Sequence, residues 1–412
     1  MSDISLTYKG VGSECVIELP ASKSISNRVL IINALSGASA PILNPAKCDD
    51  TDAMIAALES DGSDFNIGHA GTAMRFLTAY LAQRSGEWRI TGSSRMEERP
   101  IGVLVSALRD LGATIEYEKK EGYPPLKIKG CNLNGGAITV PASVSSQYIS
   151  ALMMIAPNMR QGLKLTLEGY IASRPYIDMT ASVMRTFGAQ VEWQGSNVIS
   201  IEPTGYSPVQ YRVEADWSAA SYIFQIVSLC PGMKVVVPDL LENSLQGDSG
   251  QVELWRELGV KCNFTPSGVE ICGNDSEKSL LDNQPLQYNF ALMPDLVQTF
   301  VVTCCLKGVK FSFTGVETLR IKETDRIAAL QNELLKLGYV VKSKGDSLLY
   351  WDGEVVPSSE SVTIATYRDH RMAMAFAPAA IIRKGVVIAD CEVVSKSFPT
   401  YWQVVGQLGV NS

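Results

Sequence analysis

The sequence predicts an α/β protein built from a repeated unit of helices and strands. Four amphipathic segments end in leucine or phenylalanine followed by glycine, and an apolar or alternating stretch follows each glycine. Glycine at this position supplies the left-handed cap of a helix. The glycines recur roughly every 70–80 residues, which indicates a repeated supersecondary unit. They are Gly112, Gly188, Gly259 and Gly338.

Chain length and composition place the protein in a broad class. A chain of 412 residues is too long for one hydrophobic core, so two domains are expected. No apolar run reaches membrane-spanning length, and the first residues lack the layout of a signal peptide. Nine cysteines without a C-x-x-C motif favour reduced thiols in a cytoplasm over a disulfide or zinc framework. Two histidines disfavour a histidine-based metal site. We expect no metal and no cofactor.

The charge pattern points to small anions as ligands. The net charge is −7 and no lysine/arginine run is present, which disfavours general nucleic-acid binding. The cations instead occur singly, each within a short polar motif.

The first such motif, Pro20–Arg28, leads into the apolar run Val29–Ile32. Ser22 or Ser24 is expected to cap this helix, with Lys23 and Arg28 around its first turn. Hydroxyls, free helix N–H groups and cations together favour a phosphate or carboxylate site. An ordinary serine-capped helix is the alternative.

Three further helix starts carry polar groups. Gly71 follows a glycine turn and allows close backbone approach to a ligand. Arg99 precedes Pro100, which is expected at the first position of a helix. Ser145, Ser146 and Gln147 precede an apolar helix over Tyr148–Ala156, and Ser173-Arg174-Pro175-Tyr176 repeats the Arg-Pro entry. Each of these motifs is either part of a phosphate-binding site or an ordinary helix N-cap.

Two acidic-basic motifs follow in the second half. Asp295 ends the apolar stretch Phe290–Pro294, where desolvation would raise its pKa and suit it to act as a base. The segment Lys322–Arg326 is expected to open an amphipathic helix that runs to about Leu337. Its two cations would then share one face, which favours a bound anion over a solvated helix start.

The last motifs lie near the C-terminus. Met372–Ala377 is apolar on all sides and predicts a buried helix. Arg371 at its start needs a partner, so Asp369 is either an ion-pair partner or a neighbour of a bound anion. Lys396 lies in Ser395–Pro399.

In chain order, these motifs resemble those of the 5-enolpyruvylshikimate-3-phosphate synthases. The resemblance implies a two-domain, inside-out α/β barrel of βαβαββ units, with one domain over residues 21–214 and the other over 1–20 and 215–412. It implies a transferase of aromatic amino acid biosynthesis that moves the enolpyruvyl group of phosphoenolpyruvate to the 5-hydroxyl of shikimate 3-phosphate. A cytoplasmic monomer without nucleic-acid or membrane partners is expected.

The resemblance also assigns site residues. Those expected to hold shikimate 3-phosphate are Lys23, Ser24, Arg28, Ser145, Ser146, Gln147, Ser173, Tyr176, Asp295, Thr318 and Lys322. Those expected to hold phosphoenolpyruvate are Lys23, Gly71, Arg99, Gln147, Arg326, Arg371 and Lys396. The catalytic set is Asp295 as base, Glu323 as the acid that protonates the methylene carbon, Lys322 and His370.

The chain departs from the family pattern at several points. His69 and Thr318 replace asparagines that are usual there, and Phe76 replaces a proline. The segment between Ala57 and Ile67 is too short for a β-hairpin, so one of six units is expected to be trimmed. A catalytically silent phosphometabolite-binding protein is the alternative function, and retention of Glu323 with Asp295 and Lys322 argues against it.

Overall fold

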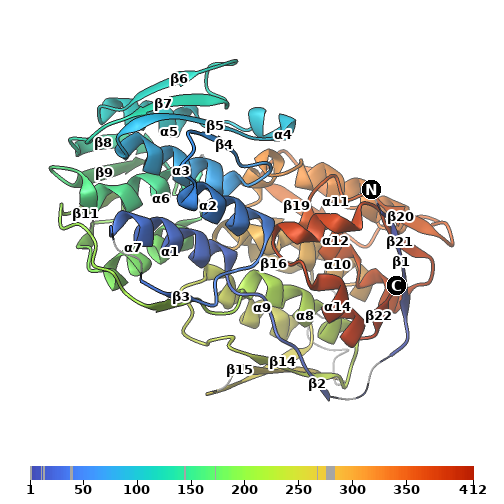
Figure 1. The fold of residues 1–412 in the computed structure, drawn as a ribbon. Helices are drawn as coiled ribbons and strands as arrows, with labels where there is room; N and C mark the ends of the chain where they lie inside the picture. The colour runs from blue at the N-terminus through green and yellow to red at the C-terminus, as the bar shows by residue number, and fades with distance from the viewer. Residues whose placement is uncertain are drawn as a thin grey trace. The chain divides into compact units, whose positions relative to one another are not determined.

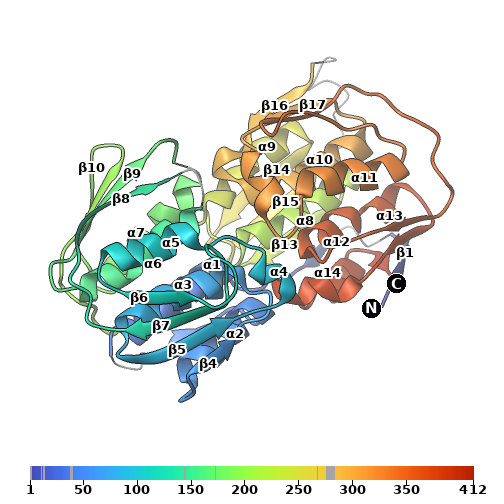
Figure 2. The same cartoon turned by 90° about the horizontal axis from the view of Figure 1, so that it is seen from above.

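The structure, a computed structural model, divides the chain into two compact units (Figures 1 and 2). The first comprises Met1–Pro20 and Glu214–Ser412, and the second comprises Ala21–Val213. The residues described are 2–10, 12, 14–37, 40–142, 145–171, 173–266, 268–274 and 284–412. No helix among these residues is long and apolar enough to cross a membrane.

A βαβαββ motif recurs in both units and forms one four-stranded sheet each time. The first two strands pair in parallel, and the last two form an antiparallel hairpin whose second strand pairs with the second strand of the motif. In unit Ala21–Val213 the first copy comprises β4 (Asp64–Asn66), α3 (Gly71–Gln83), β5 (Gly86–Thr91), α5 (Gly102–Asp110), β6 (Thr114–Tyr117) and β7 (Leu126–Gly130). A short helix, α4 (Ser94–Glu97), lies between β5 and α5.

The second copy repeats this order and pairing. It comprises β8 (Gly136–Pro141), α6 (Ser146–Ile155), β9 (Leu163–Glu168), α7 (Arg174–Thr186), β10 (Val191–Gln194) and β11 (Val198–Ile201). Helix α6 contacts both α3 and α7, and Figure 2 shows helices of this unit lying between its two four-stranded sheets. Their buried faces form the core of the unit.

The other unit contains three copies of the motif. One comprises β16 (Leu286–Asn289), α10 (Val297–Lys307), β17 (Phe311–Thr314), α11 (Arg326–Lys336), β18 (Lys342–Lys344) and β19 (Leu348–Trp351). Another comprises β2 (Glu14–Val16), α8 (Trp217–Leu229), β13 (Lys234–Pro238), α9 (Gln251–Glu257), β14 (Val260–Thr265) and β15 (Gly268–Gly273). The last comprises β20 (Val362–Ile364), α12 (His370–Phe376), α13 (Ala379–Ile382), β21 (Val386–Ile388), α14 (Tyr401–Gln407), β22 (Val410–Asn411) and β1 (Ile4–Tyr8).

The sixth copy is trimmed, as the short segment after Ala57 predicts. It contains α1 (Lys23–Leu35), β3 (Ile42–Leu43), α2 (Asp49–Glu59) and β12 (Tyr211–Arg212), and its two strands pair in parallel. Only residues 60–63 separate α2 from β4. This length leaves no room for the hairpin, so the expectation of a trimmed unit is confirmed.

The glycines of the sequence repeat end helices as expected. Gly112, Gly188, Gly259 and Gly338 have φ values of 104°, 89°, 84° and 96°, in the left-handed region. A fifth copy, Leu408-Gly409-Val410, was missed because the chain ends shortly after it. Gly409 has a φ of 86° and separates α14 from β22.

Candidate active site

In the unit that contains both termini, Arg326 is the centre of a buried network of charges. Its side chain is 1% exposed and contacts three carboxylates. Nε lies 2.7 Å from Asp369 Oδ2, Nη1 lies 3.0 Å from Asp295 Oδ1, and Nη2 lies 3.0 Å from Glu323 Oε2. One cation therefore orients three potential proton acceptors.

The helix start expected at Lys322 is wrong. Helix α11 begins at Arg326, because Asp325 is the N-cap and its side chain accepts a hydrogen bond from the backbone N–H of Ala328 at 3.1 Å. Lys322 precedes the helix in an extended conformation. It nevertheless reaches the same carboxylate as Arg326, since Lys322 Nζ lies 3.5 Å from Asp295 Oδ1.

The raised pKa expected for Asp295 is also wrong. Burial raises its pKa, but the positive charges of Arg371, Lys322 and Arg326 together outweigh burial and hold the pKa well below its ordinary value. The apolar residues that precede Asp295 in sequence are therefore a poor guide to its surroundings, which are cationic. Arg371 Nη2 lies 3.1 Å from Asp295 Oδ2.

The predicted buried helix after Asp369 is confirmed. Every residue of α12 is buried, and Asp369 caps it by accepting a hydrogen bond from the Arg371 N–H at 2.9 Å. Asp369 is thus a helix cap, as one of its two expected roles states, but its ion pair is with Arg326, whereas the Arg371 side chain pairs with Asp295. His370 is 2% exposed, and its Nδ1 lies 3.7 Å from Asp369 Oδ1.

Glu323 lies between two cations. Its Oε1 accepts a hydrogen bond from Lys396 Nζ at 2.8 Å, and Oε2 contacts Arg326. Lys396 ends a 3₁₀ helix, Cys391–Lys396, and is buried. Nearby in sequence, the Thr318 hydroxyl oxygen is buried without a hydrogen-bond partner in the described part of the chain. A buried hydroxyl without a partner is costly unless a ligand binds it.

In unit Ala21–Val213, Arg28 is a buried cation surrounded by neutral groups. It is 2% exposed and donates to Thr180 Oγ1 (2.7 Å), Ser24 O (2.8 Å), Ser150 Oγ (3.2 Å) and Tyr176 O (3.3 Å). Burial lowers the pKa of Arg28 to about 10. No carboxylate among the described residues forms an ion pair with it.

Two aromatic rings flank the Arg28 guanidinium. Its Cζ lies 5.3 Å from the centre of the Phe76 ring and 5.9 Å from that of Tyr176. These are cation–π distances, which stabilise a cation without neutralising it. Arg28 therefore remains positively charged, and an anionic ligand that reached it would form an ion pair with it.

Gly71 and Arg99 lie in contact. A Cβ atom added to Gly71 would collide with the end of the Arg99 side chain, so glycine lets this guanidinium lie close to the backbone. Arg99 does not precede a helical proline, however, because α5 begins at Gly102 with Ile101 as its N-cap. Pro100 instead accepts hydrogen bonds through its carbonyl from Arg75 Nη2 and the Tyr148 hydroxyl.

The remaining polar motifs of this unit lie at helix starts, although α6 begins at Ser146 and not at Tyr148 as predicted. Ser22 caps α1, and Lys23 Nζ lies 3.2 Å from Asp50 Oδ2. Ser145 caps α6, whose first residues are Ser146 and Gln147, and Gln147 Nε2 donates to Thr72 Oγ1 at 3.3 Å. Ser173 precedes α7 with a φ of 54°. The sequence analysis missed Asp50, although the acidic first turn of α2 was a signal.

Comparisons with known proteins agree with these motifs. A sequence model of the family described as EPSP synthase (3-phosphoshikimate 1-carboxyvinyltransferase) matches residues 59–405. A 3-phosphoshikimate 1-carboxyvinyltransferase of Bacteroides fragilis is 50% identical over 396 residues, which cover 96% of this chain and 95% of the relative. One from a Marinomonas species is 34% identical over 94% of this chain and 95% of the relative. The chain belongs to the EPSP synthase family.

A solved EPSP synthase has the same fold. The enzyme from Acinetobacter baumannii superposes with a TM-score of 0.78 at 22% identity, over 99% of this chain and 98% of that one. The two-domain α/β fold implied by the EPSP synthase resemblance is thereby confirmed.

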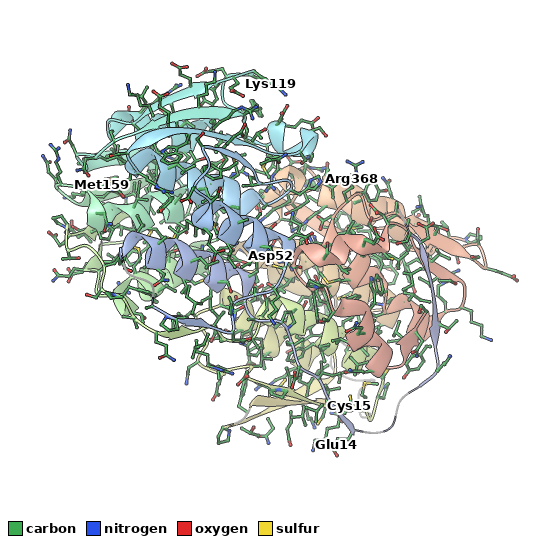
Figure 3. The ribbon with its side chains drawn as sticks, in the orientation of Figure 1. Glu14, Cys15, Asp52, Lys119, Met159 and Arg368 are labelled. Atoms are coloured by element: carbon green, nitrogen blue, oxygen red, sulfur yellow. The ribbon has the colours of Figure 1, made fainter. Side chains whose placement is uncertain are left out.

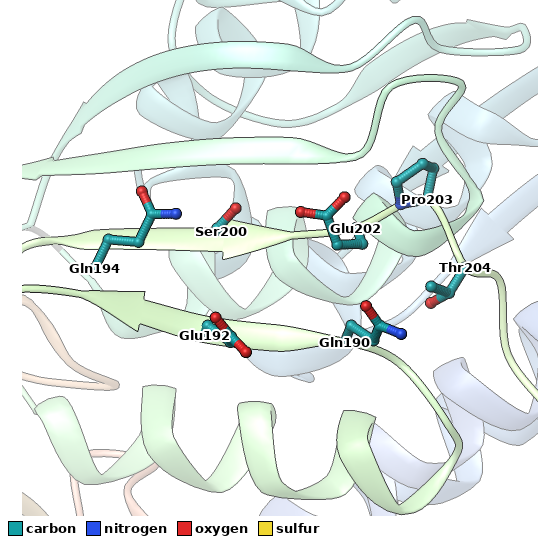
Figure 4. Close-up of a pocket in the computed structure, with 7 residues that line it drawn as sticks. All are labelled: Gln190, Glu192, Gln194, Ser200, Glu202, Pro203 and Thr204. Atoms are coloured by element: carbon teal, nitrogen blue, oxygen red, sulfur yellow. The ribbon is translucent and has the colours of Figure 1, made fainter.

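The departures from the EPSP synthase pattern have distinct surroundings. Phe76 is fully buried against Arg28. His69 is exposed, and its Nδ1 lies 2.8 Å from Ser93 Oγ. A hollow of about 390 Å³ over β10 and β11 holds no EPSP synthase motif; Figure 4 shows its lining residues, Gln190, Glu192, Gln194, Ser200, Glu202, Pro203 and Thr204.

Proposed function

We propose that this chain transfers the enolpyruvyl group of phosphoenolpyruvate to the 5-hydroxyl of shikimate 3-phosphate and releases phosphate. The proposal rests on membership of the EPSP synthase family and on the charge network around Arg326. We also propose that the enzyme acts as a monomer in the cytoplasm, in the biosynthesis of aromatic amino acids, on these two substrates and without a metal or cofactor.

The observation that carries the proposal is the position of Asp295 between Arg326 and Arg371. Both guanidinium groups lie within 3.1 Å of its carboxylate oxygens. The carboxylate of phosphoenolpyruvate has the same shape and charge, so it would pair with the same arginines. When the substrate binds, its carboxylate would compete with Asp295 for Arg326 and Arg371. The weaker ion pairs would make Asp295 more basic.

Asp295 and Glu323 would then divide the proton transfers. Asp295 takes the proton of the 5-hydroxyl as its oxygen attacks C2 of phosphoenolpyruvate, and Lys322 stabilises the developing charge. Glu323 gives a proton to the methylene carbon, which becomes a methyl group in the tetrahedral intermediate. In the second step the bond from C2 to the phosphate oxygen breaks, the departing phosphate takes the proton held by Asp295, and the methyl group returns a proton to Glu323. His370, buried beside Asp369, is the remaining catalytic assignment.

Arg28 is the main support for shikimate 3-phosphate binding. A buried cation without a carboxylate partner is costly, and an anionic substrate would relieve this cost. We assign the carboxylate or hydroxyl groups of the ring to Arg28, Ser24 and Tyr176. The substrate phosphate is assigned to Ser145, Ser146 and Ser173, whose hydroxyls lie at the starts of two helices.

The phosphate of phosphoenolpyruvate is assigned to a second group in the same unit. We assign this phosphate to Lys23, the Gly71 N–H, Arg99 and Gln147, and the family resemblance adds Lys396. Contacts between Gly71 and Arg99, and between Gln147 and Thr72, support this grouping.

Phosphate release by the purified protein tests the proposal. With both substrates, we expect one phosphate for each enolpyruvyl product, identified by its mass. Omission of shikimate 3-phosphate is the control and should abolish release. Tight binding of both substrates without release would instead support the silent binding protein.

A further inference from the structure

A buried carboxylate supports the turn that precedes the Asp369–Arg371 motif. Glu333 lies two turns after Arg326 on the same face of α11, and its side chain is 0% exposed. The EPSP synthase motifs described above give it no role. A buried carboxylate is retained only where it is fully hydrogen-bonded, so its partners indicate what it does.

Glu333 holds the segment between β20 and α12. Its Oε2 accepts a hydrogen bond from the backbone N–H of Ala365 at 2.9 Å, and its Oε1 accepts one from the Tyr367 hydroxyl at 2.7 Å. Lys336, one turn later on α11, donates to Oε2 at 2.6 Å. Both carboxylate oxygens are thus engaged, and two of the three partners belong to the turn.

The turn has a backbone conformation that its residues disfavour. Tyr367 and Arg368 have φ values of 54° and 56°, so two consecutive non-glycine residues are left-handed. Such residues persist only where surrounding contacts hold them. Both are exposed, and Arg368 is labelled in Figure 3, so packing of their side chains cannot hold the turn. The hydrogen bonds that Glu333 accepts from Ala365 and Tyr367 are in a position to hold it.

The turn sets the position of Asp369. The Asp369 N–H donates to Thr366 O at 2.8 Å, inside the turn. The Asp369 carboxylate then caps α12 at Arg371 and pairs with Arg326. Helix α11 therefore contacts the segment at two points. Glu333 accepts hydrogen bonds from the turn, and Arg326 forms an ion pair with Asp369.

We propose that Glu333 is a positioning residue that acts through the left-handed turn at Tyr367 and Arg368. By fixing the turn, it fixes Asp369 and thereby the guanidinium groups of Arg326 and Arg371. The identity of the ligand that these arginines hold, the carboxylate of phosphoenolpyruvate, rests on the proposed function. The role of Glu333 in fixing the conformation of the turn is independent of the proposed function.

Steady-state kinetics test the role in catalysis. Glu333→Gln should raise the KM for phosphoenolpyruvate about tenfold, with kcat and the KM for shikimate 3-phosphate changed less than about twofold, because the arginines bind ground state and transition state alike. Tyr367→Phe, which removes one partly buried hydroxyl, should raise the same KM about threefold. The matched control is Tyr339→Phe, which removes another half-buried tyrosine hydroxyl shortly after α11. It should leave kcat and both KM values unchanged.

Rescue by glycine distinguishes the proposed role from a general loss of stability. Arg368→Gly removes the steric penalty of the left-handed conformation. In the Glu333→Gln background it should restore at least half of the lost affinity, whereas alone it should leave the KM near that of the wild type. No rescue, or equal rises in both KM values for Glu333→Gln and Tyr367→Phe, would overturn the proposal.

Amide hydrogen exchange tests the turn without substrate. The Ala365 and Asp369 amides should exchange at least about tenfold faster in Glu333→Gln and Tyr367→Phe than in Tyr339→Phe. Unchanged exchange would refute the support of the turn by Glu333. Failure of the wild-type protein to release phosphate would refute the proposed function alone, because the exchange measurement does not depend on turnover.

Discussion

Lys396 Nζ lies 2.8 Å from Glu323 Oε1, and the second carboxylate oxygen of Glu323 contacts Arg326. Both cations are also assigned to phosphoenolpyruvate. Substrate binding therefore competes with Glu323 for its two partners. A carboxylate relieved of cations accepts a proton more readily, so arrival of the substrate would prepare Glu323 for proton transfer.

Replacement of Glu323 by glutamine tests this proton transfer. Glu323→Gln keeps the size of the side chain and removes the acid. Turnover should fall by about 10²–10⁴ while both substrates bind within a few-fold of normal affinity. Rapid-quench assays and calorimetric titration measure the two quantities. Turnover within about threefold of the wild type would remove Glu323 from the mechanism.

Replacement of Arg326 should unfold the protein more readily. Arg326→Gln leaves Asp295, Glu323 and Asp369 without their shared cation. Loss of one partner from a buried ion pair costs about 3–5 kcal/mol. Arg320→Gln is the matched control, because Arg320 pairs with Asp325 and Asp346 near the surface, where such pairs contribute about 0–1 kcal/mol. Urea unfolding of both variants should show this difference.

Gly71→Ala should weaken the binding of phosphoenolpyruvate without lowering the stability of the protein. The added Cβ would collide with the end of the flexible Arg99 side chain, which can move at little cost. The free energy of unfolding should therefore change by less than about 1 kcal/mol. Displacement of Arg99 should raise the KM for phosphoenolpyruvate about tenfold and leave that for shikimate 3-phosphate unchanged. An unchanged KM for phosphoenolpyruvate would exclude Arg99 from its site.

Phe76→Leu should weaken shikimate 3-phosphate binding through Arg28. Leucine remains apolar but lacks the ring that stabilises the guanidinium. A cation–π contact of about 0.5–2 kcal/mol corresponds to roughly 2- to 30-fold in affinity. Phe187→Leu removes an equally buried ring of the same unit that stacks on Tyr211, so it controls for lost packing. Equal losses of affinity in both variants would exclude a specific role of Phe76.

Asp248 should make stability depend on pH near neutrality. Burial and the negative charge of Asp295 raise the pKa of Asp248 to about 7. Because the folded-state pKa is raised, the carboxyl is neutral in the folded protein while it ionises in the unfolded chain. Stability should therefore fall as pH rises from about 4 to 7 and then level off, by up to about 4 kcal/mol.

Asp248→Asn supplies the comparison. It keeps an oxygen that can accept the hydrogen bond of the Ser218 hydroxyl and has no titratable proton. The difference in unfolding free energy between variant and wild type should grow in favour of asparagine between about pH 4 and 7. Parallel pH profiles for the two proteins would contradict the raised pKa.

The fold was largely predictable because local signals specify it. Glycines with a left-handed conformation follow helices, and strands with alternating polarity follow these glycines. This pattern repeats along the chain, and each repeat marks one copy of the βαβαββ motif. Residues that depend on distant partners were predicted less well. The predicted direction of the Asp295 pKa shift was wrong because Arg371 and Lys322 are remote in sequence. Glu333 was missed because two of its three partners, Ala365 and Tyr367, lie over thirty residues away. The start of α11 was misplaced because charge spacing was weighed above the capping preference of Asp325.

The two ends of the chain complete a single sheet. Strand β1 pairs with β21 and with β22, which is formed by residues 410–411 of the 412-residue chain. During synthesis β1 therefore has no partner strand until β21 and β22 have left the ribosome. By then residues 21–213 have emerged in one continuous piece and can already have folded. The unit that contains Arg326 can accordingly complete this sheet only after β22 has been synthesised, and activity should appear only once β22 is in place.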